Sequence, residues 1–221
     1  MFPATGPLPR DRYPKHLEFF RAGETHRERL FMAGNRCGKT TAGAYETALH
    51  LTGLYPDWWD GRRIPCPIDA WAAGETGAAV RDIVQRELLG PPNALGTGMI
   101  PAHLILDLAT GRGVADAIDS VYVRHVSGGT SALGFKSFAQ GRENFQGTSK
   151  NWVWIDEECP MDVYQECLMR TMVTAGDPRG GMLILTFTPL KGWSEVIEAF
   201  LGVSGDSPNP LDPDASSDRV H

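Results

Sequence analysis

One short stretch restricts the possible folds of this chain more than any other. Residues 31–41 read FMAGNRCGKTT; the apolar run 30–33 enters a glycine-bearing loop, and a helix-compatible segment follows at 42–51. A strand, a glycine-bearing loop and a helix N-terminus in this order form an anion site, in which backbone N–H groups cradle phosphate oxygens. The sequence therefore predicts a phosphate-binding loop made of Ala33, Gly34, Asn35, Arg36, Cys37, Gly38, Lys39, Thr40 and Thr41.

The loop departs from the usual pattern G-x-x-x-x-G-K-[ST] at two positions. Ala33 stands where the first glycine is expected, and Arg36 adds a cation that ordinary phosphate loops do not need. The remaining chemistry is complete, because Lys39 can reach the β- and γ-phosphates and the Thr40 hydroxyl can bind Mg²⁺. We therefore expect ATP with Mg²⁺ at this loop.

A second motif lies at the end of an apolar run, 152–155, where Asp156 and Glu157 follow directly. The carboxyl end of a buried strand is where α/β sheets place ligands. There Asp156 can hold the metal and its water shell, and Glu157 can orient and deprotonate an attacking water. The alternative is an acidic turn after a strand. The Gly-Lys-Thr of the upstream loop disfavours this alternative, because the two motifs occur together in nucleotide-binding sites.

A third motif is the apolar run 182–189, which carries Thr186 and Thr188 one pleat apart on the same face. A polar residue at such a strand tip can sense the γ-phosphate. The alternative is that both threonines are present only because threonine favours the β-strand conformation.

The rest of the chain predicts an α/β fold with a mostly parallel central sheet flanked by helices. An apolar strand at 68–74 and an amphipathic helix at 76–89 form a βα unit. Two further strands, 120–126 and 131–138, flank a Gly-Gly pair and predict a small antiparallel insertion.

The segment before the phosphate loop has two interpretations. Residues 13–20 predict a short helix with proline at its start. Tyr13 and His16 could contact the adenine, or the helix could simply pack Leu17 and its phenylalanines into the core. The paired tryptophans, Trp58 and Trp59, are expected to anchor a long loop onto the domain rather than to stack on a base.

Length and composition set the limits of organisation. A chain of 221 residues can bury one sizeable α/β core, and 42% hydrophobic with 22% charged residues is typical of a soluble globular domain. We expect a loose leader at 1–12, an ATPase domain at 13–201 and an extended tail at 202–221. No stretch is apolar enough to span a membrane, and four scattered cysteines predict reduced thiols.

Charge argues against a protein that coats nucleic acid. The net charge is −6, with ten Lys/Arg against seven Asp/Glu in residues 1–65 and eleven against twenty in residues 66–221. A local basic face, or DNA contact spread over an oligomer, remains compatible with these numbers.

Together the three motifs indicate an ATP hydrolase of the additional-strand, catalytic-glutamate (ASCE) type of P-loop NTPase. Hydrolysis needs an in-line water, Mg²⁺ and positive charge at the γ-phosphate. Lys39, Thr40 and the Asp156-Glu157 pair supply most of this. The missing element is an arginine, for which Arg36, acting in the same chain, and Arg142 are the candidates.

The same residues resemble a known family, the large motor subunit of the terminases that package DNA into tailed bacteriophages. The resemblance covers most of 13–201 and rests on the P-K-x-x-x-F-F lead-in, GNRCGKTT, VWIDEE and TFTPLKGWSE. Phosphate loops of that family lack the leading glycine and carry an internal arginine, as Ala33 and Arg36 do here. His16 stands where relatives often have glutamine in the adenine motif.

The resemblance implies further roles. Thr186 and Thr188 belong to a motif coupling hydrolysis to movement, and Arg142 lies where an arginine finger reaching a neighbouring subunit is expected. It implies a monomer in isolation that assembles into a ring, expected to be a pentamer, in the host cell cytoplasm. Its partners would be the portal protein of a procapsid, the small terminase subunit and double-stranded DNA. A nuclease domain of the family would lie outside these residues.

Two other functions would require different residues. A helicase-like nucleic-acid-dependent ATPase would need a second RecA-like domain and an arginine helix, whose motifs we do not find. A non-enzymatic docking module with a silent pocket would be favoured if Lys39, Asp156 or Glu157 were missing, and all three are present.

Overall fold

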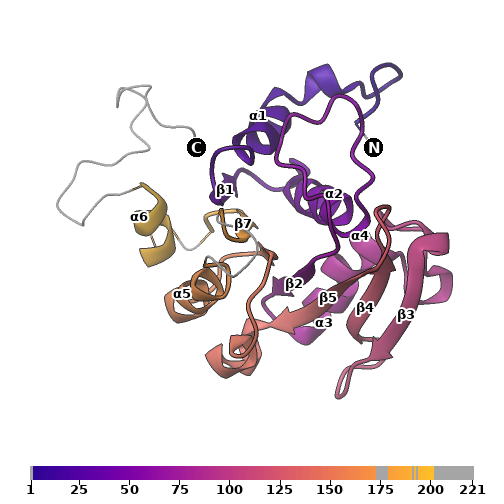
Figure 1. Cartoon of the computed structure of the whole chain (residues 1–221). Coiled ribbons are helices and arrows are strands. Elements are labelled where there is room, and N and C mark those ends of the chain that lie inside the picture. The colour runs from indigo at the N-terminus through magenta and orange to yellow at the C-terminus, as the bar shows by residue number, and fades with distance from the viewer. Residues whose placement is uncertain (1, 173–178, 191, 193, 202–221) are drawn as a thin grey trace.

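Seven strands form one sheet in the computed structural model, which describes residues 2–172, 179–190, 192 and 194–201 (Figure 1). The order across the sheet is β1-β7-β6-β2-β5-β4-β3. The strands are β1 (Glu28–Met32), β2 (Asp69–Gly74), β3 (Ile105–Thr110), β4 (Ile118–Arg124), β5 (Thr130–Ser137), β6 (Trp152–Asp156) and β7 (Met182–Phe187).

The sheet is parallel from β1 to β5 and antiparallel at the β4–β3 edge. The expected small antiparallel part is present, and it continues the central sheet. β5 pairs in parallel with β2 and antiparallel with β4, so the hairpin extends the central sheet. The edge strand β3 is visible in the sequence only as an apolar run, because its burial is intermittent.

Helices cover both faces of the sheet (Figure 1). The longest, α2, begins at Lys39 directly after the phosphate loop and ends at Thr52. The helix expected at 76–89 is continuous, but its middle part has π-helical hydrogen bonding. The helices are α1 (Pro14–Ala22), α2 (Lys39–Thr52), α3 (Gly77–Ala79), the π-helical η2 (Val80–Gln85), α4 (Arg86–Leu89), α5 (Met161–Arg170) and α6 (Glu195–Leu201). Short 3₁₀ turns are η1 (Arg10–Arg12), η3 (Pro92–Ala94), η4 (Ala102–Leu104), η5 (Phe138–Gln140) and η6 (Arg142–Phe145).

The core is divided by the sheet into two layers. Along β6, Trp152 and Trp154 pack in the layer that holds α1 and α2, while Val153 and Ile155 pack in the layer of α5 and α6. This is the alternation that a fully buried strand requires. Helix α2 lies close to the sheet at Gly43, where a Cβ atom would come within 2.3 Å of the Trp154 indole nitrogen.

Phe2 is packed, although a loose leader was expected at 1–12, and residues 3–8 are exposed. Phe2 is only 6% exposed and lies edge-on to Tyr13 and Phe20, with ring centroids 5.7 and 5.4 Å apart. The tryptophan pair anchors its loop as expected, since Trp59 is buried against Phe20. The expected tail at 202–221 lies outside the described residues.

No helix in the described part of the chain is long and apolar enough to cross a membrane.

Candidate nucleotide site

The three sequence motifs meet at one edge of the sheet. Because β1, β7 and β6 are adjacent and parallel, their carboxyl ends lie side by side. The phosphate loop follows β1, Asp156 ends β6, and Thr186 lies near the end of β7 between them. The strand between the loop strand and the acidic strand is thus β7, the additional strand expected for the ASCE arrangement.

The phosphate loop has the backbone shape that anion binding needs. Arg36 and Gly38 have φ of 62° and 79°, the left-handed conformation that occurs in anion-binding backbone nests. Lys39 is buried, and its Nζ donates a 2.7 Å hydrogen bond to the Gly34 carbonyl across the loop. The positive end of the 14-residue helix α2 adds to the attraction for a phosphate.

Asp156 is the buried acid of the site. Its side chain accepts hydrogen bonds from the Thr40 hydroxyl at 3.1 and 3.2 Å and from the Thr186 hydroxyl at 2.7 Å. The pKa of Asp156 is raised to about 7, mainly by burial; the hydrogen bonds from Thr186 and Thr40 and the charge of Lys39 oppose this rise, and the charge of Glu157 adds to it. A carboxylate in this position lacks a full counter-charge, and a cation beside it would favour its ionised form.

The oxygen atoms present suit Mg²⁺. Thr40 and Asp156 bring a hydroxyl and a carboxylate together, and both are hard oxygen ligands. The described residues contain no group of three His, Cys, Asp or Glu side chains able to form a complete metal cage. One or two protein oxygens completed by phosphate and water is the usual way in which Mg²⁺ accompanies a nucleotide.

Glu157 is held in an uncommon backbone conformation. Its φ is +80°, and its N–H donates a 2.9 Å hydrogen bond to the Thr186 carbonyl. A non-glycine residue there costs about 1–3 kcal/mol, and such strain is often found at functional sites. The turn leaves the Glu157 side chain exposed at the strand end, beside the buried Asp156.

Thr186 in β7 and Thr188 just after it both contact the other motifs. The Thr186 hydroxyl accepts a hydrogen bond from the Trp154 indole nitrogen at 2.8 Å while it donates to Asp156. The Thr188 hydroxyl donates to Oδ1 of Asn35 in the phosphate loop at 2.9 Å. One threonine thus connects β7 to the acidic strand, and the other connects the residues just after β7 to the loop. Their role in sensing the γ-phosphate stays a prediction.

A cavity of about 510 Å³, the base-side cavity, opens between the loop and the residues at the start of α1. Its walls include both candidate base contacts and part of the loop; they are Phe2, Pro3, Pro7, Leu8, Tyr13, His16, Arg36, Cys37, Gly38 and Thr41. Its size and largely apolar walls suit a purine base. Arg36 thus lines the base-side cavity, and its proposed contact with the γ-phosphate stays a prediction.

His16 packs against the phosphate loop at Gly38. It is buried, and its Nε2 would lie 3.2 Å from a Cβ atom at Gly38. Burial lowers the pKa of His16, and the nearby backbone of Gly38 and Cys37 opposes that shift. A neutral imidazole packed edge-on to Phe31 at 4.8 Å is both a core residue and a wall of the cavity, so the two interpretations of this helix are compatible.

Arg142 lies away from the loop of its own chain. Its Nε donates a 2.9 Å hydrogen bond to Glu166 on α5, in the layer opposite α2. Within the described residues it makes no hydrogen bond or ion pair with the phosphate loop. This placement is compatible with action on a neighbouring subunit.

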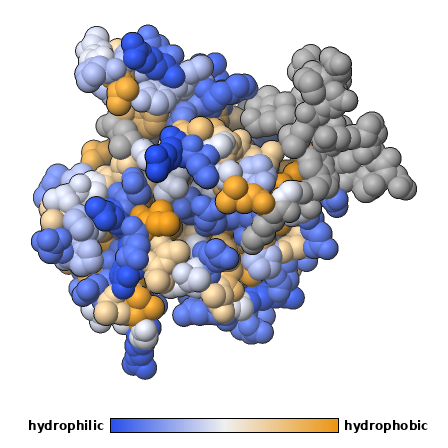
Figure 2. All heavy atoms as spheres, turned by 180° about the vertical axis from the view of Figure 1, so that it is seen from behind, coloured by the Kyte–Doolittle hydropathy of each residue, from blue (hydrophilic) through white to orange (hydrophobic). Residues whose placement is uncertain are grey.

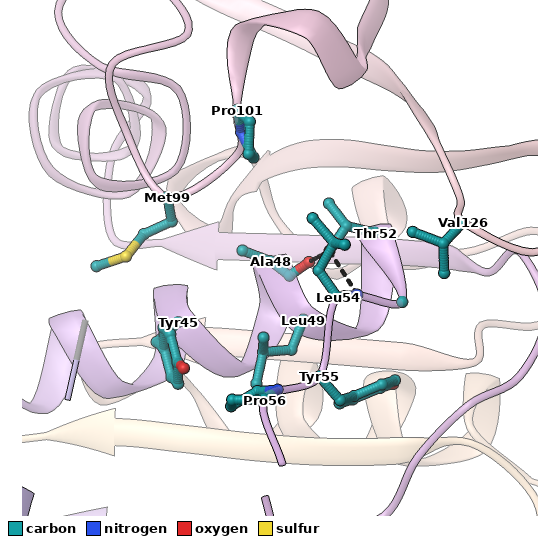
Figure 3. Close-up of a pocket in the computed structure, with 11 residues that line it drawn as sticks. Tyr45, Ala48, Leu49, Thr52, Leu54, Tyr55, Pro56, Met99, Pro101 and Val126 are labelled. Carbon is teal, nitrogen blue, oxygen red and sulfur yellow. Dashed lines mark hydrogen bonds between the residues drawn. The ribbon is translucent and has the colours of Figure 1, made fainter. Parts of the chain in front are cut away.

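A second cavity is chemically unsuited to a nucleotide. It has a volume of about 520 Å³ and lies beside the C-terminal half of α2, between Tyr45, Leu54, Met99 and Val126 (Figure 3). None of its lining residues is charged. On the face seen in Figure 2, hydrophobic side chains occur in small separate groups among hydrophilic ones.

Sequence reasoning missed three parts of the site. Trp154 has the sequence pattern of a core residue in an apolar strand, and only the fold shows its contact with Thr186. Phe2 belongs to the segment that was expected to be loose. Glu166 belongs to an ordinary amphipathic helix, and no sequence signal pairs it with Arg142.

Comparisons with known proteins agree with this geometry. Residues 30–217 match the family model described as the N-terminal part of the terminase large subunit of the T4likevirus type. The chain is 38% identical over 209 residues to the terminase large subunit of Salmonella phage P22, an alignment covering 86% of this chain and 41% of that protein. The chain thus spans less than half the length of this relative.

Two solved structures share the fold. The large terminase ATPase domain of Thermus phage P74-26 has a TM-score of 0.56 at 18% identity, covering 93% of this chain and 80% of that one. A large terminase from another thermophilic bacteriophage has a TM-score of 0.53 at 16% identity, covering 79% of this chain and 37% of that one.

Proposed function

Because this chain belongs to the terminase large-subunit family and matches its N-terminal part, we propose that it is the ATP-hydrolysing motor domain that drives double-stranded DNA into a viral procapsid. The observation that carries the proposal is the connection of three motifs through side chains. Thr40 and Thr186 both bond to Asp156, and Thr188 bonds to Asn35 of the loop. A change at the γ-phosphate would thus reach β7 directly.

The residues of the chain divide the work of hydrolysis. The loop 33–41 holds the phosphates, and Lys39 exchanges its bond to the Gly34 carbonyl for the β- and γ-phosphates. Thr40 and Asp156 would hold Mg²⁺, which supplies positive charge to the phosphates when bound. Glu157 orients the attacking water and accepts its proton.

Positive charge on the γ-phosphate comes from two arginines in this proposal. Arg36 acts from within the loop of the same chain, and Arg142 acts from the neighbouring chain. Since the ion pair with Glu166 keeps Arg142 on the α5 side of the sheet, a single chain would hydrolyse ATP slowly. Assembly would complete the site.

Thr186 and Thr188 then pass the change to the strand. Loss of the γ-phosphate would alter the positions of Asp156, which is hydrogen-bonded to Thr186 in β7, and of Asn35, which is hydrogen-bonded to Thr188 just after it. The segment that follows β7 would transmit this movement. We further propose a ring of copies, expected to be a pentamer, bound to the portal protein and small subunit in the host cell cytoplasm.

Glu157→Gln is the direct test of the ATPase assignment. The variant should bind a fluorescent ATP analogue as tightly as the unmodified chain, while phosphate release falls by about 10²–10⁴-fold, the usual contribution of a general base. Undiminished phosphate release would remove the catalytic role. Stimulation by procapsids with double-stranded DNA, but not by single-stranded DNA, would support packaging over a helicase-like function.

A further inference from the structure

A buried carboxylate connects two arginines beside α5. Glu166 has a side chain only 1% exposed, whereas the side chain of Arg142 is 46% exposed. Glu166 accepts through Oε2 from Arg142 Nε at 2.9 Å and through Oε1 from Arg170 Nε at 2.9 Å and Nη2 at 2.5 Å.

The two arginines are attached differently. Arg170 uses Nε and Nη2 for Glu166 and donates from Nη1 to the Gly147 carbonyl at 2.6 Å. Arg142 uses only Nε, and within the described residues its Nη1 and Nη2 make no hydrogen bond or ion pair. The terminal fork of Arg142, the part that binds a phosphate bidentately, is therefore available to another molecule.

The charges explain why both arginines are needed. A buried carboxylate that loses its only counter-ion is strongly destabilising. Arg170 would remain paired with Glu166 if Arg142 shifted toward a ligand, so that movement leaves no buried charge uncompensated. The helix itself fixes this arrangement, because Glu166 and Arg170 are four residues apart on α5.

We propose that Glu166 is a positioning residue that presents Arg142 to ATP bound by a second copy of this chain, with Arg170 as the standing counter-ion of Glu166. The proposal rests on the proposed function, because it needs a nucleotide at the neighbouring site. Holding the guanidinium by Nε limits its rotation before the copies meet. A preorganised cation loses less entropy on reaching the phosphate than a free side chain does.

The test uses two copies of the chain joined by a long Gly/Ser linker, so that each meets the other at high effective concentration. Glu166→Gln in both copies should lower kcat about 10–100-fold, the effect expected when a reacting group is misplaced by about 1 Å. The KM for ATP and the affinity for a fluorescent ATP analogue should not change. Glu18→Gln, on the exposed Lys15 ion pair, makes the same chemical change and should leave kcat unaltered.

Complementation separates positioning from simple damage to the fold. A tandem protein with Glu166→Gln in one copy and Glu157→Gln in the other should regain a substantial part of the activity. Its first copy has an intact catalytic site, and its second has a correctly held Arg142. Failure of this pair to recover, with both variants folded by circular dichroism, overturns the proposal.

Arg142→Ala distinguishes the positioning role of Glu166 from the trans role of Arg142 itself. A tandem protein with Arg142→Ala in both copies should lose activity. One with Arg142→Ala in one copy and Glu157→Gln in the other should recover it, which supports the arginine acting in trans. If Arg142→Ala is inactive and rescued but Glu166→Gln has normal kcat, only the positioning role is wrong. If Arg142→Ala has normal kcat, the trans role itself is wrong and the inference falls with it.

Discussion

Thr186 and Asp156 face one another across adjacent parallel strands and share a 2.7 Å hydrogen bond. The same threonine oxygen accepts from the buried indole of Trp154, so its single proton is directed at the carboxylate. The acid expected to hold Mg²⁺ is therefore oriented by the strand expected to couple hydrolysis to movement. One hydroxyl group serves both purposes.

Thr186→Val should separate binding from hydrolysis. Valine keeps the shape of threonine but removes the bond to Asp156, a loss of about 1.5–3 kcal/mol for a charged partner. If this interaction supports the transition state, kcat falls by about 10–100-fold. Steady-state phosphate release and titration with a fluorescent ATP analogue measure the two effects. Thr110→Val, at an exposed position on the edge strand β3, is the matched control and should change neither.

Glu157→Gly should make the protein inactive without destabilising it. Glycine removes the cost of about 1–2 kcal/mol that a side chain has at positive φ, against an entropic cost of about 0.5–1 kcal/mol. The unfolding free energy from urea titration is therefore expected to stay equal or rise slightly. Glu75→Gly, at an exposed position without positive φ, has no such strain to relieve and should lower stability by about 1 kcal/mol. A clear loss of stability in Glu157→Gly would show that the strained turn is not costly.

The positions of the motifs could be predicted because each lies in a local pattern. The loop 33–41 carries its glycines and lysine in a contiguous run, and Asp156 follows four apolar residues directly. The parallel sheet then follows from strands separated by helices. The sequence therefore indicated which motifs meet at one edge of the sheet, and the roles of the acid, base and hydroxyl residues stay predictions.

Contacts between distant elements could not be predicted. Glu166 and Arg142 are 24 residues apart on separate elements, and their ion pair depends on how α5 lies on the sheet. Phe2 has no periodic neighbours, so nothing local indicates that it is buried. The edge strand β3 alternates weakly because only part of one face is covered. In each case tertiary packing decides the outcome.

Phe2→Ala should weaken nucleotide binding as well as the fold. Phe2 packs on Tyr13 and His16 and lines the base-side cavity, so its loss removes part of one wall. We expect an unfolding free energy lower by about 3 kcal/mol and an affinity for ATP about tenfold weaker, corresponding to roughly 1.4 kcal/mol. Phe2→Leu, which retains an apolar side chain, is the control and should retain most of both. Unchanged affinity in folded Phe2→Ala would show that the leader takes no part in the site.

A buried charge network predicts how stability depends on pH. His50 lies fully buried between Glu46, whose Oε1 is 3.3 Å from Nε2, and the Tyr55 hydroxyl, 2.7 Å from Nδ1. Burial lowers the pKa of His50; the hydrogen bond and charge of Glu46 oppose this, and the charges of Arg29 and Arg62 add to it. The folded state therefore holds fewer protons than the unfolded state just below the ordinary pKa of 6.5.

The unfolding free energy should consequently fall as the pH decreases from 7.5 to 5.5, by at most about 1.4 kcal/mol per pH unit for each such histidine. The lowered pKa of His16 acts in the same direction, so the wild-type slope combines both groups. His50→Gln removes one titrating group and should flatten the slope measured by urea unfolding at several pH values. His26→Gln, at an exposed position, is the matched control and should retain the wild-type slope. An unchanged slope in His50→Gln would show that His50 does not resist protonation in the folded protein.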